Sequence, residues 1–499
     1  MNNKNINIII AEPMSTAFNF LEDIRTRGYN PVILEAYIPH GYARKLMDEE
    51  RKVKYARIKY PIKIIREDTD YDKTLHEIKE LDPLLVLPGG EEGVVIGTRL
   101  ADDLGLTGNP FENIAAMTEK TVMHQRLKEA GLRYIRSKEV SSSEQCITFL
   151  EALRKEDVVL KHIHGVASVG VHLVHGIKEL LSAFQKESSA ENMFGESNNR
   201  LMIQERIFGE EYIVNTISRD GIPALTSVLR YYKKQTSSGA IIYQGIESVN
   251  ELGEKEKSLV DYAFSAVCAL GITDGPVHGE YMIDSDGPVL IEANCRVMGG
   301  SAPVEFLDKV FGHHETDIIL DSILDREFHR EFRQRPYKPL RKGYVKDFIS
   351  AGDQVISSSG IIPILLSMKS FQSGWVSNAG LTEILRETVD LETETGCVYL
   401  VHDDENVTRK EFELLMFIEE NYPKLLHSDS PLFLAPDDKS QITPRIAEIL
   451  QSDTEGLIFD IIEYFRKGAQ GEPIVPESLL ELCPYNREIM ELLKRLCEI

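Results

Sequence analysis

The stretch that decides the fold is residues 277–300, VHGEYMIDSDGPVLIEANCRVMGG. It reads as two short strands joined by a tight turn, because the turn residues DSDG (284–287) end in an Asp-Gly pair that is typical of hairpins. Glu280 and Glu292 are equally far from Asp286. A hairpin centred on Asp286 therefore predicts that the two glutamates lie opposite each other on one face.

Strand alternation adds two more side chains to this face, His278 beside Glu280 and Asn294 beside Glu292. Carboxylates placed directly opposite each other repel and destabilise a hairpin, so a cation is expected between them. Two carboxylates and an amide oxygen, with positions left for water and phosphate oxygens, suit Mg²⁺. Mn²⁺ is an alternative ion for the same set. The sequence therefore predicts a metal site formed by Glu280, Glu292 and Asn294.

The alternative interpretation is a solvated hairpin whose outer face happens to be acidic. The residues that flank the glutamates, Val289, Leu290, Ile291 and Met298, are apolar and indicate a partly buried hairpin. Unpaired carboxylates are costly in such a place, and this favours the metal site.

The spacing Glu292-x-Asn294-x-Arg296, one turn after a strand that bears Glu280, resembles the magnesium site of ATP-grasp enzymes. The resemblance implies an α/β ATP-grasp fold with an N-terminal open parallel α/β domain, a glycine-lid subdomain and a C-terminal α+β cap. It also implies ATP and Mg²⁺ as cofactors. In this picture Arg296 and His278 are catalytic residues, and the turn Gly299-Gly300 joins Arg296 as an anchor for the substrate.

Two further segments match this family in the expected order. A single helix is expected over residues 112–131; it contains Glu119-Lys120, and the resemblance implies that Lys120 reaches the α-phosphate. A buried strand then ends at Lys161 and is followed by a glycine-bounded loop and a second apolar strand. The loop differs from a P-loop because Val171-His172 replaces the Lys-Ser/Thr pair. Lys161, Gly165, Ser168 and Gly170 are the predicted phosphate contacts, with Lys161 also catalytic.

The stretch 201–215, LMIQERIFGEEYIVN, resembles the ATP-grasp hinge. The resemblance implies that Glu205 and the Ile207 backbone contact adenine and that Glu211 holds the ribose. Glu210 is the alternative if the turn slips by one residue. Without the neighbouring motifs, acids at a strand end would be interpreted as solvent-exposed charges.

Strands alternate with helices in the first part of the chain, which predicts a parallel sheet; its loop PGGEEG lies at a strand's carboxyl end, where Glu91 or Glu92 could face the substrate. The basic connector RQRPYKPLRK suggests a later boundary. The predicted domains are 1–108 (N-terminal α/β), 109–330 (ATP-grasp core, with the lid at about 135–203), 331–430 (cap) and 431–499 (helical segment).

The 499 residues carry a net charge of −24, which argues against broad binding to nucleic acid or anionic membranes. Six cysteines are scattered singly, so neither a zinc site nor a disulfide framework is expected. The short apolar run near the N-terminus is too brief for a signal peptide, and a cytoplasmic location is expected. A homodimer remains open.

Together these motifs predict an ATP-dependent ligase that joins a carboxylate to an amine through an acyl phosphate and releases ADP and phosphate. The length, His278-x-Glu280 and the R-x-x-G-G sequence most resemble L-amino acid ligases, which make dipeptides, so amino acids are the expected substrates. The alternatives are an ATP-grasp carboxylase of biotin or purine metabolism and a nucleotide-binding scaffold without turnover. The identity of the acid and the amine is left open.

Overall fold

The structure is a computed structural model. The residues it describes are 6–39, 42–162, 171–188, 201–236, 241–350, 354–355, 365, 368–376, 384–385, 387–390, 393–421 and 432–433. The chain divides into two compact units. The first runs to Tyr231 and resumes from Val249 to Leu340, and the second holds Tyr232–Ser248 and the chain from Arg341 onward.

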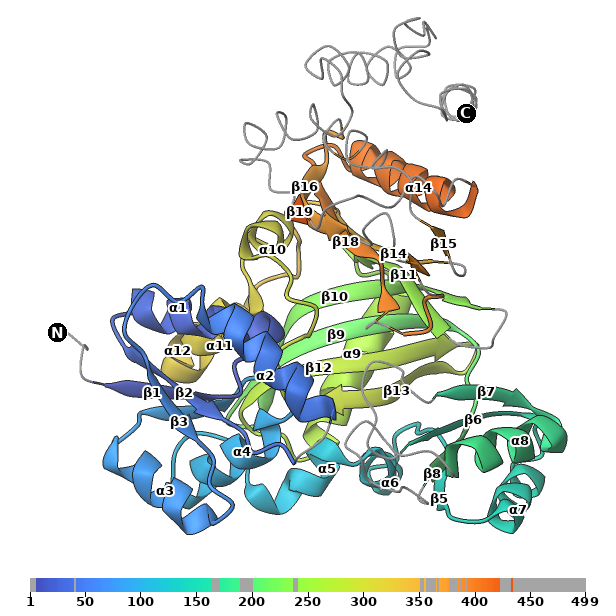
Figure 1. Ribbon diagram of the computed structural model, residues 1–499, viewed down its shortest axis with the longest axis horizontal. Helices are drawn as coiled ribbons and strands as arrows, with labels where there is room; N and C mark the ends of the chain where they lie inside the picture. Colours follow the sequence, from blue (N-terminus) through green and yellow to red (C-terminus); the bar gives the residue numbers. More distant parts are fainter. Residues whose placement is uncertain are drawn as a thin grey trace, which may run out of the picture. The chain divides into compact units, whose positions relative to one another are not determined.

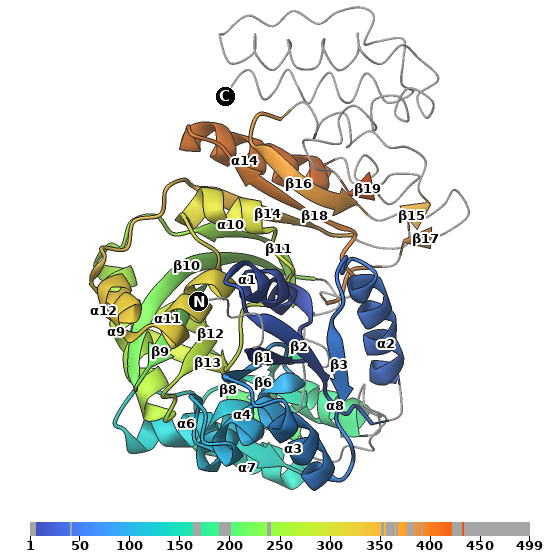
Figure 2. The same cartoon turned by 90° about the vertical axis from the view of Figure 1, so that its left-hand side faces the viewer.

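The first unit begins with a four-stranded parallel sheet in the order β3-β2-β1-β4, which confirms the predicted open α/β domain (Figure 2). Its strands are β1 (Asn7–Ala11), β2 (Asn30–Glu35), β3 (Lys63–Arg66) and β4 (Leu85–Pro88). Its helices are η1 (Ser15–Asn19, 3-10), α1 (Phe20–Thr26), α2 (Tyr42–Tyr55), α3 (Tyr71–Glu80) and α4 (Gly93–Asp103).

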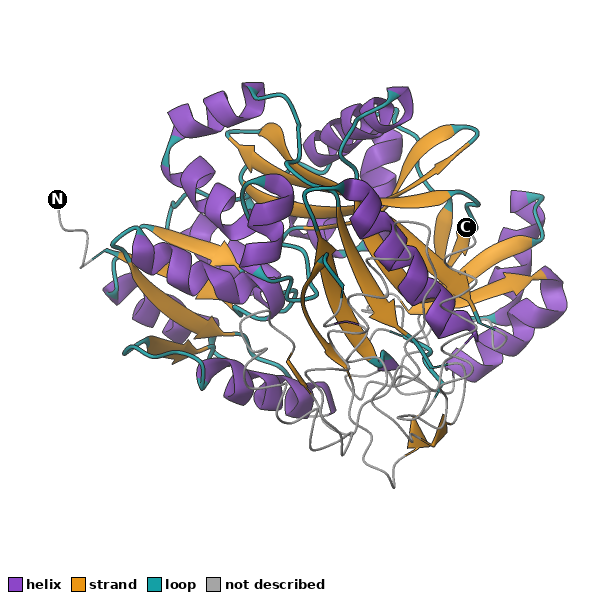
Figure 3. Cartoon of the chain, turned by 90° about the horizontal axis from the view of Figure 1, so that it is seen from above, coloured by secondary structure: helices purple, strands orange, loops and turns teal. Residues whose placement is uncertain are grey.

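Helices cover both faces of this sheet, as Figure 3 shows near the N-terminus. Ile8 and Ile10 of β1 pack into a cluster with residues of α1 and of later helices, whereas Ile9 and Ala11 pack with residues of α3 and α4. Burial on both faces explains why β1 is a continuous apolar run rather than an alternating one.

The lid subdomain is an antiparallel sheet in the order β5-β8-β6-β7 (Figure 1). Val158, Leu160, Leu201 and Ile203 pack against its two helices, so the opposite face of the sheet carries Lys161. The elements are β5 (Ser137–Val140), α7 (Ser143–Leu153), β6 (Asp157–His162), β7 (His172–His175), α8 (Gly176–Ser188) and β8 (Leu201–Glu205).

The prediction of a single helix over residues 112–131 is wrong. The chain instead forms η2 (Phe111–Asn113, 3-10), α5 (Ile114–Thr118) and α6 (Lys120–Glu129). Glu119 has extended angles, φ −110° and ψ 110°, which end α5 and start α6 at Lys120. The break places Lys120 in the first turn of a helix, a position that decides its role below.

The core of the first unit is the antiparallel set β13-β12-β9-β10, whose inner face packs on α9 around Tyr212, Tyr281 and Leu290. Three further helices follow the hairpin. The elements are β9 (Glu210–Arg219), β10 (Ile222–Gln235, which crosses the boundary at Tyr231), α9 (Glu254–Ala269), β12 (Gly275–Asp284), β13 (Gly287–Asn294), α10 (Val304–Phe311), α11 (Glu315–Leu324) and α12 (Arg326–Gln334).

The second unit is an antiparallel sheet covered by a helix. β14 pairs with β11 and β18, and buried Lys346 of β14 donates to Glu419 of the helix at 2.8 Å. The elements are β11 (Ile241–Ser248), β14 (Gly343–Phe348), β15 (Gln354–Val355), β16 (Phe371–Val376), β17 (Ile384–Leu385), β18 (Gly396–Val401), α14 (Glu405–Asn421) and β19 (Leu432–Phe433). Within the described parts of the chain, no helix has the length and apolar character that a bilayer crossing requires.

Candidate active site

The two glutamates of the hairpin face each other. β12 and β13 pair antiparallel, and the register joins Glu280 to Glu292 and His278 to Asn294. This is the arrangement that strand alternation predicts, so four of the predicted site residues share one face of the sheet. The opposite face of the hairpin packs on the core of α9.

The predicted centre of the turn is wrong, but a β-bulge in the hairpin restores the predicted pairing of Glu280 with Glu292. Asp284 pairs with Gly287, which places the centre half a residue earlier than Asp286. Straight counting from this pair would set Ile291 opposite Glu280. The register shifts by one residue after Glu280, which makes Ile291 the extra residue of a β-bulge. The bulge thereby moves Glu292 into the pairing position.

The adjacent strand β9 adds one acid to the same face. Its register pairs Glu211 with Met282, two residues from Glu280, so the side chains of Glu211 and Glu280 project to the same side. Glu210 projects to the other side, where Arg230 lies 3.3 Å from it. The alternation therefore supports Glu211 over Glu210 as the acid that faces the site.

Each hairpin carboxylate has protein partners. Lys120 Nζ lies 2.6 Å from Glu292 Oε2, and the Asn294 amide donates to Glu292 Oε1 at 3.3 Å. Tyr231 donates from its hydroxyl to Glu280 Oε1 at 3.1 Å. A cation was expected between the two opposed acids, and Lys120 supplies a positive charge beside one of them, Glu292.

A short polar chain orients His278 beside Glu280. The Asn215 amide nitrogen donates to Ser227 Oγ at 2.9 Å, so its oxygen is left to accept from His278 Nδ1, also at 2.9 Å. His278 Nε2 then lies 3.5 Å from Glu280 Oε1. His278 is buried, and this geometry directs its ring at a predicted metal ligand.

The charges of this cluster set its protonation states. Burial would raise the pKa of Glu292, but the charges of Lys120 and Lys161 outweigh it and hold the pKa at about 2. Burial opposes the charged form of Lys120 too, yet the charge and hydrogen bond of Glu292 raise its pKa. Burial and then the charge of Lys120 lower the pKa of Lys161 to about 8. At neutral pH Glu292 is thus an anion, and Lys120 and Lys161 are cations.

Two buried polar atoms near Lys161 have no hydrogen-bond partner among the described residues. Gln204 shares the Lys161 face of the sheet, because Gln204 pairs with Val159 and Lys161 pairs with Met202. Gln204 is 4% exposed, and its Oε1 has no hydrogen-bond partner in the described chain; the same holds for Nε2 of buried His124 on α6. Unsatisfied buried polar atoms are costly, so a polar ligand such as ATP fits this face.

Arg296 connects the hairpin to the N-terminal domain. Its Nε donates to Glu91 Oε2 at 2.8 Å, and Glu91 lies in the loop after β4. Gly93 makes this loop possible, since a Cβ there would lie 2.0 Å from the Ala11 carbonyl oxygen. The glutamate that the sequence offered as a substrate contact is therefore paired with the predicted catalytic arginine.

The turn at Gly299-Gly300 is fixed to the same domain. The Thr16 hydroxyl donates to the Gly299 carbonyl at 3.2 Å. Lys54 Nζ of α2 donates to Ser301 Oγ at 2.9 Å and to the Ser15 carbonyl at 3.2 Å. Burial lowers the pKa of Lys54, and the charge of Glu50, whose carboxylate lies 3.9 Å away, only partly opposes this shift. A poorly neutralised cation thus lies beside the predicted substrate anchor.

The predicted adenine residues lie at the end of β8 (Glu205) and in the segment that leads to β9 (Ile207). The carboxylate of Glu205 is bound by Arg136 at 3.0 Å and Lys155 at 2.5 Å, and Ile207 is half-buried in the connecting segment. The predicted phosphate contacts Gly165, Ser168 and Gly170 lie outside the described residues.

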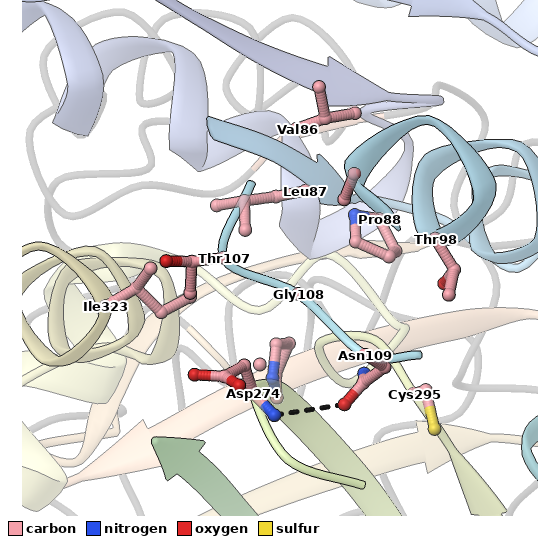
Figure 4. Close-up of a pocket in the computed structure, with 13 residues that line it drawn as sticks. Val86, Leu87, Pro88, Thr98, Thr107, Gly108, Asn109, Asp274, Cys295 and Ile323 are labelled. Atoms are coloured by element: carbon pink, nitrogen blue, oxygen red, sulfur yellow. Dashed lines mark hydrogen bonds between the residues drawn. The ribbon is translucent and has the colours of Figure 1, made fainter. Parts of the chain in front are cut away.

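A small cavity lies away from this face (Figure 4). Val86, Leu87 and Cys295 are among its lining residues, and Asp274 N donates to Asn109 Oδ1 at 3.0 Å across it. Cys295 is 3% exposed, and burial raises its thiol pKa. Cys295 is therefore a packing residue.

The donor set of the hairpin fits a hard divalent cation. Among the described residues, no group of three or more His, Cys, Asp and Glu side chains is arranged to hold a metal ion. Glu280, Glu292 and Asn294 together offer two carboxylates and an amide, which leaves coordination positions for water and phosphate oxygens as Mg²⁺ prefers.

Several residues of this site could not be read from the motifs. Tyr231 and Asn215 come from strands whose register is set by long-range pairing. Glu91 was considered, but its partner Arg296 lies 205 residues away in sequence. Lys54 lies in a helix that the sequence did not predict, and no local pattern marks it.

Parts of the sequence are similar to known proteins. The family model described as ATP-grasp domain matches residues 154–305. Dapdiamide A synthase of Enterobacter agglomerans is 27% identical over 71% of this chain and 84% of its own length. The L-arginine-specific L-amino acid ligase of Bacillus subtilis is 26% identical over 44% of this chain and 53% of its own length.

Among solved structures, the L-amino acid ligase from Bacillus licheniformis superposes with a TM-score of 0.60 at 17% identity, covering 87% of this chain and 99% of that one. This likeness shows the fold. The two sequence relatives are likewise named as a synthase and an amino acid ligase. Residues 154–305 thus match the ATP-grasp domain, and the enzymes that the whole chain resembles include L-amino acid ligases.

Proposed function

We propose that this protein joins the carboxylate of one amino acid to the amine of a second substrate, with ATP hydrolysed to ADP and phosphate. The observation that carries the proposal is the set of charges on one side of the sheet: Glu280 and Glu292 opposed, with Lys120 and Lys161 close enough to shift the Glu292 pKa. This pattern fits a magnesium–triphosphate complex, and the sequence relatives are ligases and synthases of small molecules.

The protein residues have distinct tasks in this reaction. Lys120 and Lys161 bind the triphosphate, Glu205 and the Ile207 backbone bind adenine, Glu211 binds the ribose, and Glu280, Glu292 and Asn294 hold the metal. Mg²⁺, when bound, supplies neutralisation of phosphate charge during transfer. His278 and Tyr231 orient Glu280, which keeps the metal-binding face in a fixed geometry.

The chemistry proceeds in two displacements. An oxygen of the acid substrate attacks the γ-phosphorus, the bond to ADP breaks, and an acyl phosphate forms. The amine nitrogen then attacks the acyl carbon, and phosphate leaves with the oxygen that the acid contributed. Arg296 stabilises the charge on the transferring group and on the tetrahedral oxyanion. Water would hydrolyse the acyl phosphate, so this reaction requires an active site from which water is excluded.

The substrates are placed by the loop between Arg296 and Ser301. Glu91 neutralises Arg296 in the ligand-free protein and can be released to an ammonium group of a substrate when Arg296 turns to a carboxylate or phosphate. Gly299 and Gly300, with Lys54 beside them, suit a substrate carboxylate. ATP and free amino acids are both abundant in the cytoplasm, where we expect the enzyme to act.

The proposal is tested by ADP release in the presence of pairs of amino acids. We expect ADP and phosphate to form in equal amounts, and only when both an acid and an amine partner are present. Bicarbonate with biotin, or with an aminoimidazole ribonucleotide, should not replace the amino acids. ADP release that follows bicarbonate would support the carboxylase instead, and no ADP release with any pair in a folded, ATP-binding protein would support a scaffold.

A further inference from the structure

We propose that Lys120 holds the place of the metal ion in the nucleotide-free protein, so that the metal binds tightly only when the nucleotide draws Lys120 away. The inference rests on the proposed function, because it takes Glu292 as a metal ligand and Lys120 as a triphosphate ligand. The new element is that the Lys120 side chain pairs with the metal ligand Glu292 at one time and with the triphosphate at another, which couples the metal site to the nucleotide site.

The contact that carries this inference is direct. Lys120 Nζ lies 2.6 Å from Glu292 Oε2, and the two side chains are 15% and 21% exposed. The other oxygen of Glu292 accepts from Asn294 at 3.3 Å. A divalent ion bound through Glu292 Oε2 would share that oxygen with the ammonium of Lys120. An ammonium retained at this distance would repel the ion strongly in a poorly solvated site.

Lys120 is also held in a place that favours its release. It is the first residue of α6, where the helix dipole disfavours a positive charge. The charge of Lys161 acts against it from the lid sheet, as the lowered pKa of Lys161 reflects. Glu292 offsets these effects in the nucleotide-free protein. A triphosphate offers Lys120 more negative charge than one carboxylate does, so the lysine moves to phosphate and Glu292 becomes free.

The consequence is mutual strengthening of metal and nucleotide binding. If the nucleotide removes the competing lysine, it raises the affinity of the metal, and by linkage the metal raises the affinity of the nucleotide by the same factor. The protein then binds the metal weakly by itself. Part of the cooperativity of metal–nucleotide binding comes from Lys120, in addition to the direct bonds between metal and phosphate.

The test measures Mn²⁺ alone, by the electron paramagnetic resonance signal of the free ion in a titration of nucleotide-free protein. We expect Lys120→Met to bind Mn²⁺ at least about tenfold more tightly than the parent, which is about 1.4 kcal/mol. Lys52→Met is the matched control, because Lys52 pairs with Glu49 at 2.6 Å on the exposed face of α2 and its loss changes the net charge equally. The control should bind Mn²⁺ as the parent does.

Equal or weaker Mn²⁺ affinity in Lys120→Met would overturn the inference. Lys120→Gln, which keeps a donor for Glu292 without the charge, replaces the methionine variant if that protein fails to fold. Glu292→Gln in the Lys120→Met background tests the metal site itself, separately from the competition between Lys120 and the metal. If it abolishes Mn²⁺ binding while Lys120→Met alone has no effect, only the inference fails. If it leaves Mn²⁺ binding unchanged, the metal site of the proposed function fails as well.

Discussion

Glu292→Gln should reduce ligase turnover by about a thousandfold or more while the protein remains folded. The substitution keeps the shape of the side chain and removes the charge on which both Lys120 and the metal depend. Loss of a carboxylate ligand removes several kcal/mol of charge stabilisation from phosphoryl transfer, and each 1.36 kcal/mol is about tenfold in rate. The measurement is ADP release at saturating ATP and amino acids.

The same variant should also be less stable without ligands, by about 1 kcal/mol, because Lys120 would be left without its counterion in a place that is 15% exposed. Repulsion between the opposed glutamates alone would predict the reverse, a gain in stability. Asp286→Asn in the exposed turn of the same hairpin is the control and should leave both properties unchanged. Turnover at the parental rate in Glu292→Gln would remove the hairpin from the chemistry.

Lys161→Met should weaken binding of a non-hydrolysable ATP analogue by about tenfold or more. A charge-assisted hydrogen bond to phosphate is worth about 1.5–3 kcal/mol, and the strand-end position leaves the fold intact. The affinity should also depend on pH. Because the pKa of Lys161 is lowered to about 8, the side chain is cationic below this pH and neutral above it. Parental affinity should therefore fall as the pH rises through 8.

The variant should lose this pH dependence, since methionine does not titrate. Calorimetric titration at pH 7 and pH 9 measures both effects, and Lys178→Met on the exposed side of α8 is the control. Unchanged affinity at pH 7 in a folded Lys161→Met protein would mean that Lys161 does not contact the nucleotide. A parental affinity that is flat between the two pH values would contradict the electrostatic environment described for this residue.

The local motifs determined the central elements of the site because they depend on neighbouring residues. The Asp-Gly turn and strand alternation were sufficient to pair Glu280 with Glu292 and to place His278 and Asn294 beside them. The bulge at Ile291 was not predictable, because it is a property of the pairing between strands and leaves no mark in the residue pattern. The predicted pairing of Glu280 with Glu292 was correct because the error in the position of the turn was offset by the one-residue shift of the bulge.

Other features lay beyond local patterns for the same reason. Glu119 and Lys120 are both tolerated within helices, so the sequence of residues 112–131 did not predict the break between α5 and α6. This break makes Lys120 the first residue of a helix. The pairing of Lys120 with Glu292 joins residues far apart in sequence and required the fold. It also changed the interpretation of the hairpin, because a lysine side chain supplies positive charge beside Glu292, where only a metal ion had been expected.

The central claim is that the acid substrate is activated as an acyl phosphate. The most direct measurement supplies ATP, Mg²⁺ and a mixture of the common amino acids with both carboxyl oxygens replaced by ¹⁸O, and follows the label by mass spectrometry. We expect phosphate that carries one ¹⁸O atom per amide bond formed, together with unlabelled ADP. Label in AMP, or unlabelled phosphate accompanying amide formation, would contradict it.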